Sequence, residues 1–179
     1  MARGRLVDVR SSPEAAGAVQ DFDAFYAGEY SAIVALAFAL SGSRWAAEDL
    51  AQDAFLAAHR DWDRIGAYER PGAWVRQVVT NLSVSAFRRR IAEAKALTRA
   101  AIGQPTSVSE LSADGADFWR AVRSLPRRQA QAVTLHYLED LSVADIAEIL
   151  GTAEGTVKKH LHEGRKALAQ RFGSEERGA

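Results

Sequence analysis

A stretch near the C-terminus has a spacing that few folds satisfy. Residues 141–168 read LSVADIAEILGTAEGTVKKHLHEGRKAL, in which four and then six positions separate Ala147, Gly151 and Val157. Two closely crossing helices need a small residue at the crossing, a glycine that ends the first helix and an aliphatic residue buried in the second. The spacing therefore predicts a helix-turn-helix, whose second helix enters the major groove of DNA.

The side chains around this turn support the same interpretation. We expect Ser142 to cap the first helix, with Asp145 near its positive end, and Thr152 to cap the second. Val157 and Leu161 would then point inward. A solvated basic face on an ordinary helical hairpin is the plain alternative. The residues predicted to contact DNA are Thr156, Lys158, Lys159, His160, His162, Glu163, Arg165 and Lys166.

Apolar residues recur at helical spacing through most of the remaining chain, and no convincing pair of alternating strands appears. The pattern predicts helices over 22–40, 46–62 and 73–90, with a break at 66–72. We therefore predict an all-α fold of two small helical domains joined by a flexible linker, the second a helix-turn-helix domain. The expected ranges are a disordered extension at 1–20, domains at 21–95 and 115–172, a linker at 96–114 and a tail at 173–179.

The composition excludes several kinds of site. The 179 residues include no cysteine, which rules out disulfides, thiolate metal sites and cysteine nucleophiles. The apolar run Ala32–Leu40 is far shorter than the roughly 20 residues of a membrane span. His160 and His162 are two positions apart and would point to different faces of a helix, which disfavours a metal site. We expect no cofactor, no metal and no membrane contact.

The formal net charge of zero conceals blocks of opposite sign. Residues 21–70 contain nine acidic and four basic residues, a net charge of −5. Residues 71–104 contain six basic residues and one acidic residue, a net charge of +5, and residues 154–172 have a net charge of +3. Clustered charge creates a local potential whatever the total, so the neutral sum does not argue against nucleic acid.

Three motifs follow one another in a recognisable order. AEDLAQDAFLAAHRDW, AWVRQVVTNLSVSAFRRR and the helix-turn-helix resemble, in this order, bacterial RNA polymerase sigma factors of the extracytoplasmic-function (ECF) type. The resemblance covers residues 21–172. It implies a cytoplasmic, dissociable promoter-specificity subunit that catalyses nothing itself. One domain would recognise and melt the −10 element, and the other would recognise the −35 element.

The acidic helix is similar to the sigma segment that binds the clamp helices of the polymerase β′ subunit. A negative helix face can orient a basic partner helix, although an ordinary exposed acidic face would have the same spacing. The resemblance also implies contact of the second domain with the β flap, and an anti-sigma factor as a further partner. The positions implied in clamp binding are Asp49, Leu50, Gln52, Asp53, Phe55 and Leu56.

The next helix resembles the reader of the −10 element. Trp74 matches a tryptophan of that segment, although core packing is an equally ordinary role for such a residue. The loop before the helix matches one that captures a flipped base, on which Tyr68 would stack and to which Glu69 would hydrogen-bond. An ordinary surface turn is the plain alternative for this loop. The implied −10 contacts are Tyr68, Glu69, Trp74, Arg76, Gln77, Thr80, Asn81, Arg88, Arg89 and Arg90.

The chain departs from the family pattern at Ser85, which stands where an aspartate is common, and at two neighbouring positions of the helix-turn-helix. Glu163 stands where many members have arginine; it would repel phosphate but could accept a hydrogen bond from cytosine N4. Gly164 stands where alanine is usual, at a cost to the helix of roughly 1 kcal/mol.

Two other functions are alternatives to that of a sigma factor. A free-standing regulator with a LuxR-like helix-turn-helix would have a similar recognition helix, but it has no reason to have the two upstream motifs. A small helical enzyme or adaptor is the second alternative, but no nucleophile–base pair or phosphate-binding glycine loop is apparent.

Overall fold

The computed structural model describes residues 21–83 and 113–175, and within these ranges every regular element is a helix, as predicted. In chain order they are α1 (Phe22–Ser41), α2 (Arg44–Arg60), α3 (Trp62–Ile65), a helix over residues 71–83, α5 (Ala113–Ser124), α6 (Arg127–Tyr137), α7 (Val143–Leu150) and α8 (Glu154–Glu175).

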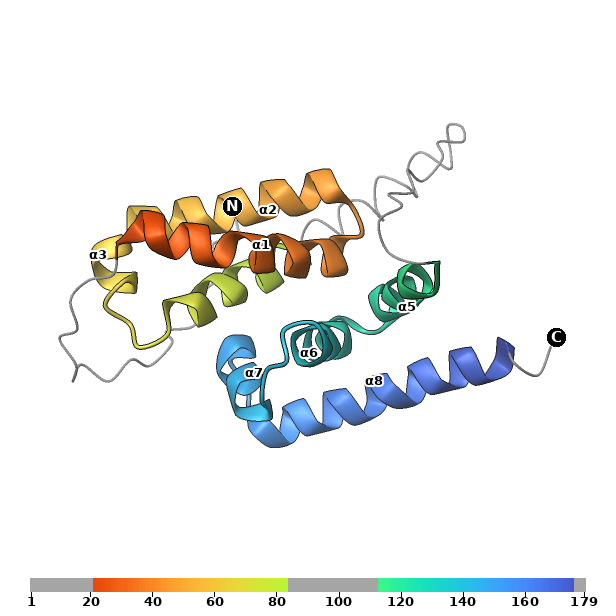
Figure 1. The fold of residues 1–179 in the computed structure, drawn as a ribbon. Coiled ribbons are helices and arrows are strands. Elements are labelled where there is room, and N and C mark those ends of the chain that lie inside the picture. Colours follow the sequence, from red (N-terminus) through yellow and green to blue (C-terminus); the bar gives the residue numbers. More distant parts are fainter. Residues whose placement is uncertain (1–20, 84–112, 176–179) are drawn as a thin grey trace, which may run out of the picture.

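The first half of the chain is built on the hairpin of α1 and α2, which lie side by side (Figure 1). Gly42 reverses the chain with φ of 70°, a left-handed conformation that glycine adopts without steric cost. The Ser43 hydroxyl then accepts from the amide of Ala46 and caps α2. Helix α1 is long and apolar enough to cross a membrane by length and composition alone. Its apolar residues, however, include Ile33 and Leu36, which are fully buried in the protein core.

The helix over residues 71–83 lies between this hairpin and the second half (Figure 1). This helix begins at Pro71, inside the predicted break at 66–72 and two residues before the predicted helix start at 73. Proline is well suited to the first turn of a helix. Its buried residues Val75 and Val79 pack in the same core as α1 and α2. Both faces of this helix are therefore covered along much of its length.

The second half consists of α5 to α8, with the long α8 passing beneath α6 and α7 in Figure 1. Pro126 directly precedes α6, whose first helical residue is Arg127. Ser142 and Asp145 form a capping box at the start of α7, and Gly151 ends α7 with φ of 61°. These contacts confirm the predicted start and end of the first helix of the helix-turn-helix.

Thr152 does not cap the next helix, contrary to the prediction. Helix α8 begins at Glu154, where the amides of Thr156 and Val157 donate to the Ala153 carbonyl. The Thr152 amide instead donates to Ala147 O at 2.9 Å, which closes the end of α7. The turn is one residue longer than predicted because Gly151 and Thr152 together satisfy the last carbonyls of α7.

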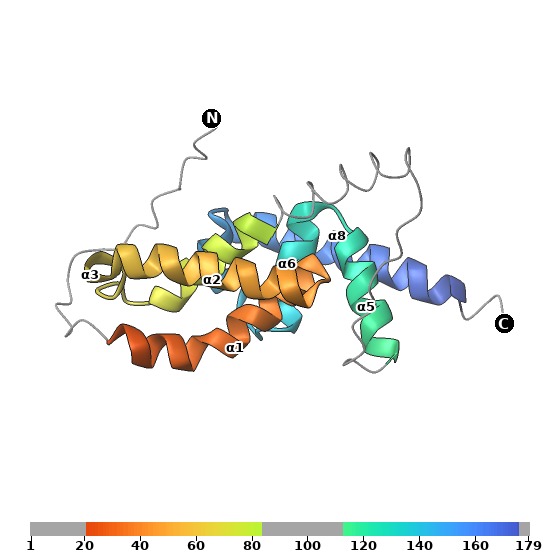
Figure 2. The ribbon, with the colours of Figure 1, turned by 90° about the horizontal axis from the view of Figure 1, so that it is seen from above.

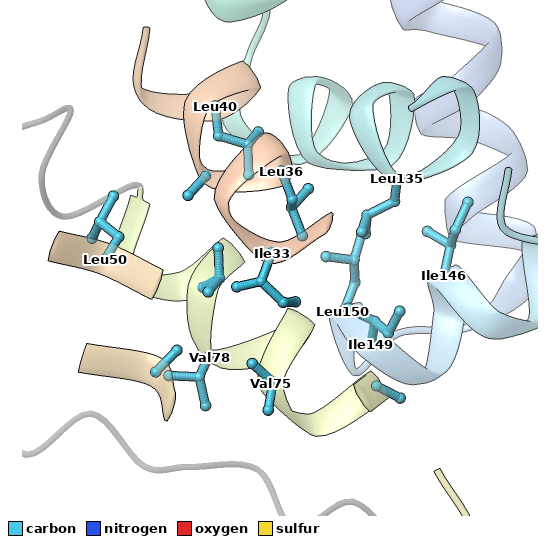
Figure 3. Close-up of a cluster of buried hydrophobic side chains, with 14 of the residues drawn as sticks. Ile33, Leu36, Leu40, Leu50, Val75, Val78, Leu135, Ile146, Ile149 and Leu150 are labelled. Atoms are coloured by element: carbon cyan, nitrogen blue, oxygen red, sulfur yellow. The ribbon is translucent and has the colours of Figure 1, made fainter. Parts of the chain in front are cut away.

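The two halves share one hydrophobic core (Figure 3). Ile33 and Leu36 of α1 face Leu135 of α6 and Leu150 of α7, and all four are buried. Helix α6 contacts α1, and in the view from above it crosses the α1–α2 hairpin (Figure 2). The prediction of two helical domains is confirmed and their boundaries remain predictions, and in this structure the two halves also pack against each other.

Some predicted boundaries differ from the helix ends. Helix α5 begins at Ala113, inside the predicted linker, and α8 continues to Glu175, inside the predicted tail. The extension at 1–20 and most of the linker lie outside the described residues.

Candidate nucleic-acid interface

Helix α2 divides its predicted clamp-binding residues between two faces. Leu50 and Phe55 are 7% and 2% exposed and pack in the core, where Phe55 contacts Tyr26 edge to face at a centroid distance of 4.9 Å. The structure therefore assigns these two side chains to packing. The other four predicted residues, Asp49, Gln52, Asp53 and Leu56, are exposed on the outer side of α2.

Trp45, which is absent from the predicted set, extends this outer face by one turn. Its side chain is 75% exposed, and it precedes Asp49 by four positions, so both lie on the same side of α2. Leu56 at the other end is 54% exposed. We call the exposed set Trp45, Asp49, Gln52, Asp53 and Leu56 the α2 stripe. The spacing of four residues between Trp45 and Asp49 is the sequence signal that could have placed Trp45 on this face.

The predicted −10 residues of the 71–83 helix are mostly covered. Trp74, Gln77 and Thr80 are 9%, 5% and 0% exposed. The Thr80 hydroxyl donates to Gln77 O at 2.9 Å, and Gln131 of α6 donates to Thr80 O at 2.8 Å. Trp74 thus packs in the core, which is the alternative role given above for this residue, and Thr80 faces the second half of the protein.

Arg76 forms the most enclosed ion-pair cluster of the described residues. Its guanidinium bonds Glu29 of α1 at 2.7 Å and Glu139 of the α6–α7 loop at 2.8 Å. Side-chain exposure is 14% for Arg76 and 6% for Glu139. Burial lowers the pKa of Arg76, but the carboxylates of Glu139 and Glu29 outweigh burial and hold the pKa above its ordinary value.

Two further residues near and on the 71–83 helix, Arg70 and Asn81, bond to the second half. Arg70, just before the 71–83 helix, pairs with Asp145 and with Glu148 of α7, the latter at 3.3 Å. Asn81, predicted to contact DNA, accepts from Arg127 of α6 at 3.3 Å. We call all these contacts of Arg70, Arg76, Thr80 and Asn81 with the second half the seam. No pattern in the sequence pairs residues that are 46 to 78 positions apart in this way.

The remaining predicted −10 residues lie elsewhere. Tyr68 is half-buried and packs against the hydrophobic core, whereas Glu69 beside it is exposed. Arg88, Arg89 and Arg90 lie outside the described residues. The structure therefore does not gather all ten predicted residues on one exposed surface.

The outer face of α8 is exposed and basic. Lys158, Lys159, His162, Arg165 and Lys166 are exposed, whereas Thr156, His160 and Glu163 are half-buried. Val157 and Leu161 are 0% and 3% exposed and hold the helix to the core, as predicted. This side of α8 can present cations to a phosphate backbone while its N-terminal residues approach base edges.

Two residues of this face have partners from α6. The Arg165 guanidinium donates to the Tyr137 hydroxyl at 2.7 Å and lies over its ring. The Glu163 carboxylate accepts from Gln129 at 3.0 Å and lies 3.9 Å from the Lys159 ammonium. Gln129 therefore fixes the direction of Glu163 before any DNA is bound.

The comparisons with known proteins cover both halves. The family model described as Sigma-70 region 2 matches residues 25–92, and the model described as Sigma-70, region 4 matches residues 116–168. The ECF RNA polymerase sigma factor SigM of Mycobacterium tuberculosis is 31% identical over 155 residues, covering 85% of this chain and 77% of SigM. SigW of Bacillus subtilis, another ECF sigma factor, is 28% identical, with 78% and 82% covered.

A solved structure is similar to the whole arrangement. The sigma factor RpoE of Bartonella quintana, in complex with the anti-sigma factor NepR, matches with a TM-score of 0.68 at 28% identity. The match covers 87% of this chain and 98% of the RpoE chain.

Proposed function

Because the chain belongs to the ECF RNA polymerase sigma factors, we propose how its described surfaces divide the work of starting transcription. Proteins of this family are soluble regulators that bind DNA and RNA polymerase. The match to Sigma-70 region 2 over residues 25–92 disfavours a free-standing LuxR-like regulator, which has no use for that region. We place the protein in the cytoplasm, where polymerase and promoter DNA are found.

We assign the α2 stripe to the β′ clamp helices of core polymerase. The observation that carries this assignment is the alignment of Asp49, Gln52 and Asp53 between two exposed apolar side chains, Trp45 and Leu56, on one face of α2. Interfaces gain most of their energy from a few buried aromatic and aliphatic anchors, while surrounding charges set orientation. A basic helix with an apolar edge is the partner that this pattern fits.

The 71–83 helix and the loop before it would hold the melted −10 strand. Gln77 and Asn81 offer paired donors and acceptors to base edges, and Arg76 offers charge to phosphate. Capture of unstacked bases by this helix and Tyr68 would offset the few kcal/mol that unpairing costs. None of these side chains needs to catalyse a chemical step.

The exposed face of α8 would read the −35 duplex, with the second half bound to the β flap. Neither half needs high affinity alone, because polymerase and the linker hold both on one promoter at a high effective concentration.

An anti-sigma factor is the inhibitory partner that we propose. The support is the likeness to RpoE, which was solved with the anti-sigma factor NepR. A cleft borders the seam, lined by Phe25 and Gly28 of α1 and by Leu141 and Ile149 of the second half. Such a cleft suits a partner that grips both halves at once.

The test is promoter-dependent transcription by core polymerase with and without the added protein. Replacement of Asp49 and Gln52 by alanine should weaken binding to core and lower the yield of transcript, with the helical circular dichroism unchanged. Asp63→Ala in α3 is the matched control, because Asp63 is an exposed acidic residue of the same half but lies outside the α2 stripe. Equal core affinity of the double variant and the control would refute the clamp assignment.

A further inference from the structure

We propose that the seam is an autoinhibitory contact: acidic residues of the second half occupy the −10 reading helix until the two halves separate. The inference rests on the proposed function of the 71–83 helix. We call the arrangement with the seam intact the closed form. In the closed form, the residues of the 71–83 helix that would read the −10 element are covered by the second half. They become accessible only when the two halves separate.

The first argument is the chemistry of Arg76. An arginine that reads promoter DNA must present its guanidinium to phosphate or to a base edge. Here two carboxylates, those of Glu29 and Glu139, bond that guanidinium at 2.7 and 2.8 Å. Carboxylate and phosphate compete for the same donors of arginine. Glu139, which belongs to the second half, therefore stands where a DNA phosphate would have to bind.

The second argument is that the acidic residues come from a constrained segment. Asp140 has φ of 51°, a left-handed conformation that aspartate tolerates better than most residues, and it shapes the short loop between α6 and α7. Glu139 precedes it, and Asp145 and Glu148 follow on α7, where they pair with Arg70. One loop and one helix thus direct three carboxylates at two arginines of the first half.

The third argument is burial of the neutral reading residues. Gln77 is 5% exposed and Thr80 is fully buried, and the buried side chain of Gln131 in the second half donates to the Thr80 carbonyl at 2.8 Å. The shared core of Ile33, Leu36 and Leu135 also joins the two halves (Figure 3). A nucleic acid strand cannot reach Gln77 or Thr80 while this layer is intact.

The likeness to RpoE adds an independent line of support. Its chain, solved with an anti-sigma factor, matches over 98% of its length with a TM-score of 0.68, so both of its halves take part in the match. The closed form is thus close to the arrangement of a sigma factor that is held by its inhibitor. In our proposal, this chain adopts that arrangement through its own contacts.

A reversible crosslink tests the closed form in the full chain. The sequence has no cysteine, so Arg70→Cys with Glu148→Cys provides a single reactive pair across the seam. A short bis-maleimide that a reductant can cleave should join the pair within one chain. With core polymerase, the crosslinked protein should give at least about tenfold less promoter transcript, because the crosslink holds the closed form and makes the open form inaccessible. Cleavage of the crosslink should restore the yield.

The control is the same double variant treated with N-ethylmaleimide, which modifies both thiols without joining them. Equal transcription by crosslinked and control protein would overturn the proposal. Failure of the pair to crosslink would also overturn it, because the halves would not be in contact in solution. If even the untreated chain gives no transcript, the proposed function fails instead.

A second variant tests the acidic residues. Glu139→Gln with Glu148→Gln removes two charges from the seam and should increase the radius of gyration by small-angle X-ray scattering. It should also raise the affinity of the free chain for a pool of single-stranded DNA by about tenfold. Asp117→Asn with Glu154→Gln changes the net charge equally and breaks only pairs within one helix. A gain of the same size in this control would refute the role of the seam.

Discussion

At the scale of single residues, the packing around position 164 explains why this chain has a glycine where alanine is usual in the family. A Cβ at this position would lie 2.8 Å from Cγ2 of Val133, a stiff and fully buried side chain of α6. Gly164→Ala should therefore lower the free energy of unfolding by about 1 kcal/mol, because overpacking costs about 1–3 kcal/mol and the gain in helix propensity offsets roughly 1 kcal/mol.

Urea unfolding measures this difference, and Gly155→Ala in the same helix is the control. Nothing lies within 4 Å of a Cβ at Gly155, so that variant should be neutral or more stable. Stabilisation by both substitutions would show that α6 and α8 do not pack as closely as described.

The side chain of Asp145 makes stability depend on pH. Hydrogen bonds from Ser142, and then from Arg70, hold the pKa of Asp145 below its ordinary value. A lowered pKa in the folded state stabilises the protein above the unfolded pKa of about 3.9, and the stabilisation disappears as the pH falls through the folded value. Asp145→Asn should therefore be less stable than the original chain near neutral pH and approach it in acid. A stability difference that does not change between pH 7 and pH 3, in urea titrations, would contradict this assignment.

Glu163 is the residue whose effect on promoter choice can be separated from its effect on affinity. Gln129 orients its carboxylate at 3.0 Å, so it can present an acceptor to a base. Glu163→Arg should change which −35 sequences the holoenzyme selects from randomised duplexes, because a good base contact is worth about 1–3 kcal/mol of discrimination. Lys158→Ala, the control, should weaken all sequences alike. A uniform gain for Glu163→Arg would place the carboxylate beside phosphate.

At the scale of secondary structure, the α2 stripe predicts an aromatic anchor. Trp45→Ala should weaken binding to core polymerase by about 2 kcal/mol, roughly 30-fold, because exposed tryptophans that become buried on binding are frequent hot spots. Trp45→Phe should keep much of the affinity, since a ring remains. Both affinities can be measured with immobilised core. Equal binding of Trp45→Ala and the original chain would remove Trp45 from the interface.

Helix positions were largely predictable because the apolar periodicity that defines a helix is local. Leu50 and Phe55 lie on the buried side of α2, as their spacing with Ala54 and Ala58 predicts. Their place in the family motif had suggested a role in clamp binding as well, and motif matching alone cannot separate buried from exposed positions. The start of α8 was misplaced because Thr152 is a good cap by type, whereas the turn needed its amide for α7.

At the scale of the whole molecule, the contact between the halves could not be predicted. The linker pattern indicated two separate domains, and no local signal relates Thr80 to Gln131 or Arg76 to Glu139. Such pairs depend on how two helical units dock, which side-chain periodicity does not encode. Of the residues that match a DNA-reading motif, Trp74, Gln77 and Thr80 were found covered, whereas the basic residues of α8 are exposed.

The shared core predicts that the two halves unfold together. Each half alone is small and would be marginally stable, whereas Ile33, Leu36, Leu135 and Leu150 join them in one hydrophobic cluster. Urea should therefore produce one cooperative transition, with the same midpoint for every probe.

The four tryptophans allow each half to be followed separately. Trp119 is the only tryptophan of the second half, so a variant with phenylalanine at positions 45, 62 and 74 reports on that half, and Trp119→Phe reports on the first. In each variant, we expect the midpoint measured by tryptophan fluorescence to coincide with the midpoint measured by circular dichroism. Glu139→Gln with Glu148→Gln should pull the two transitions apart, because it weakens the seam but leaves each half intact. If the two halves unfold in separate transitions in a chain whose seam residues are unchanged, the halves are independent in solution. The contact would then not stabilise the closed form.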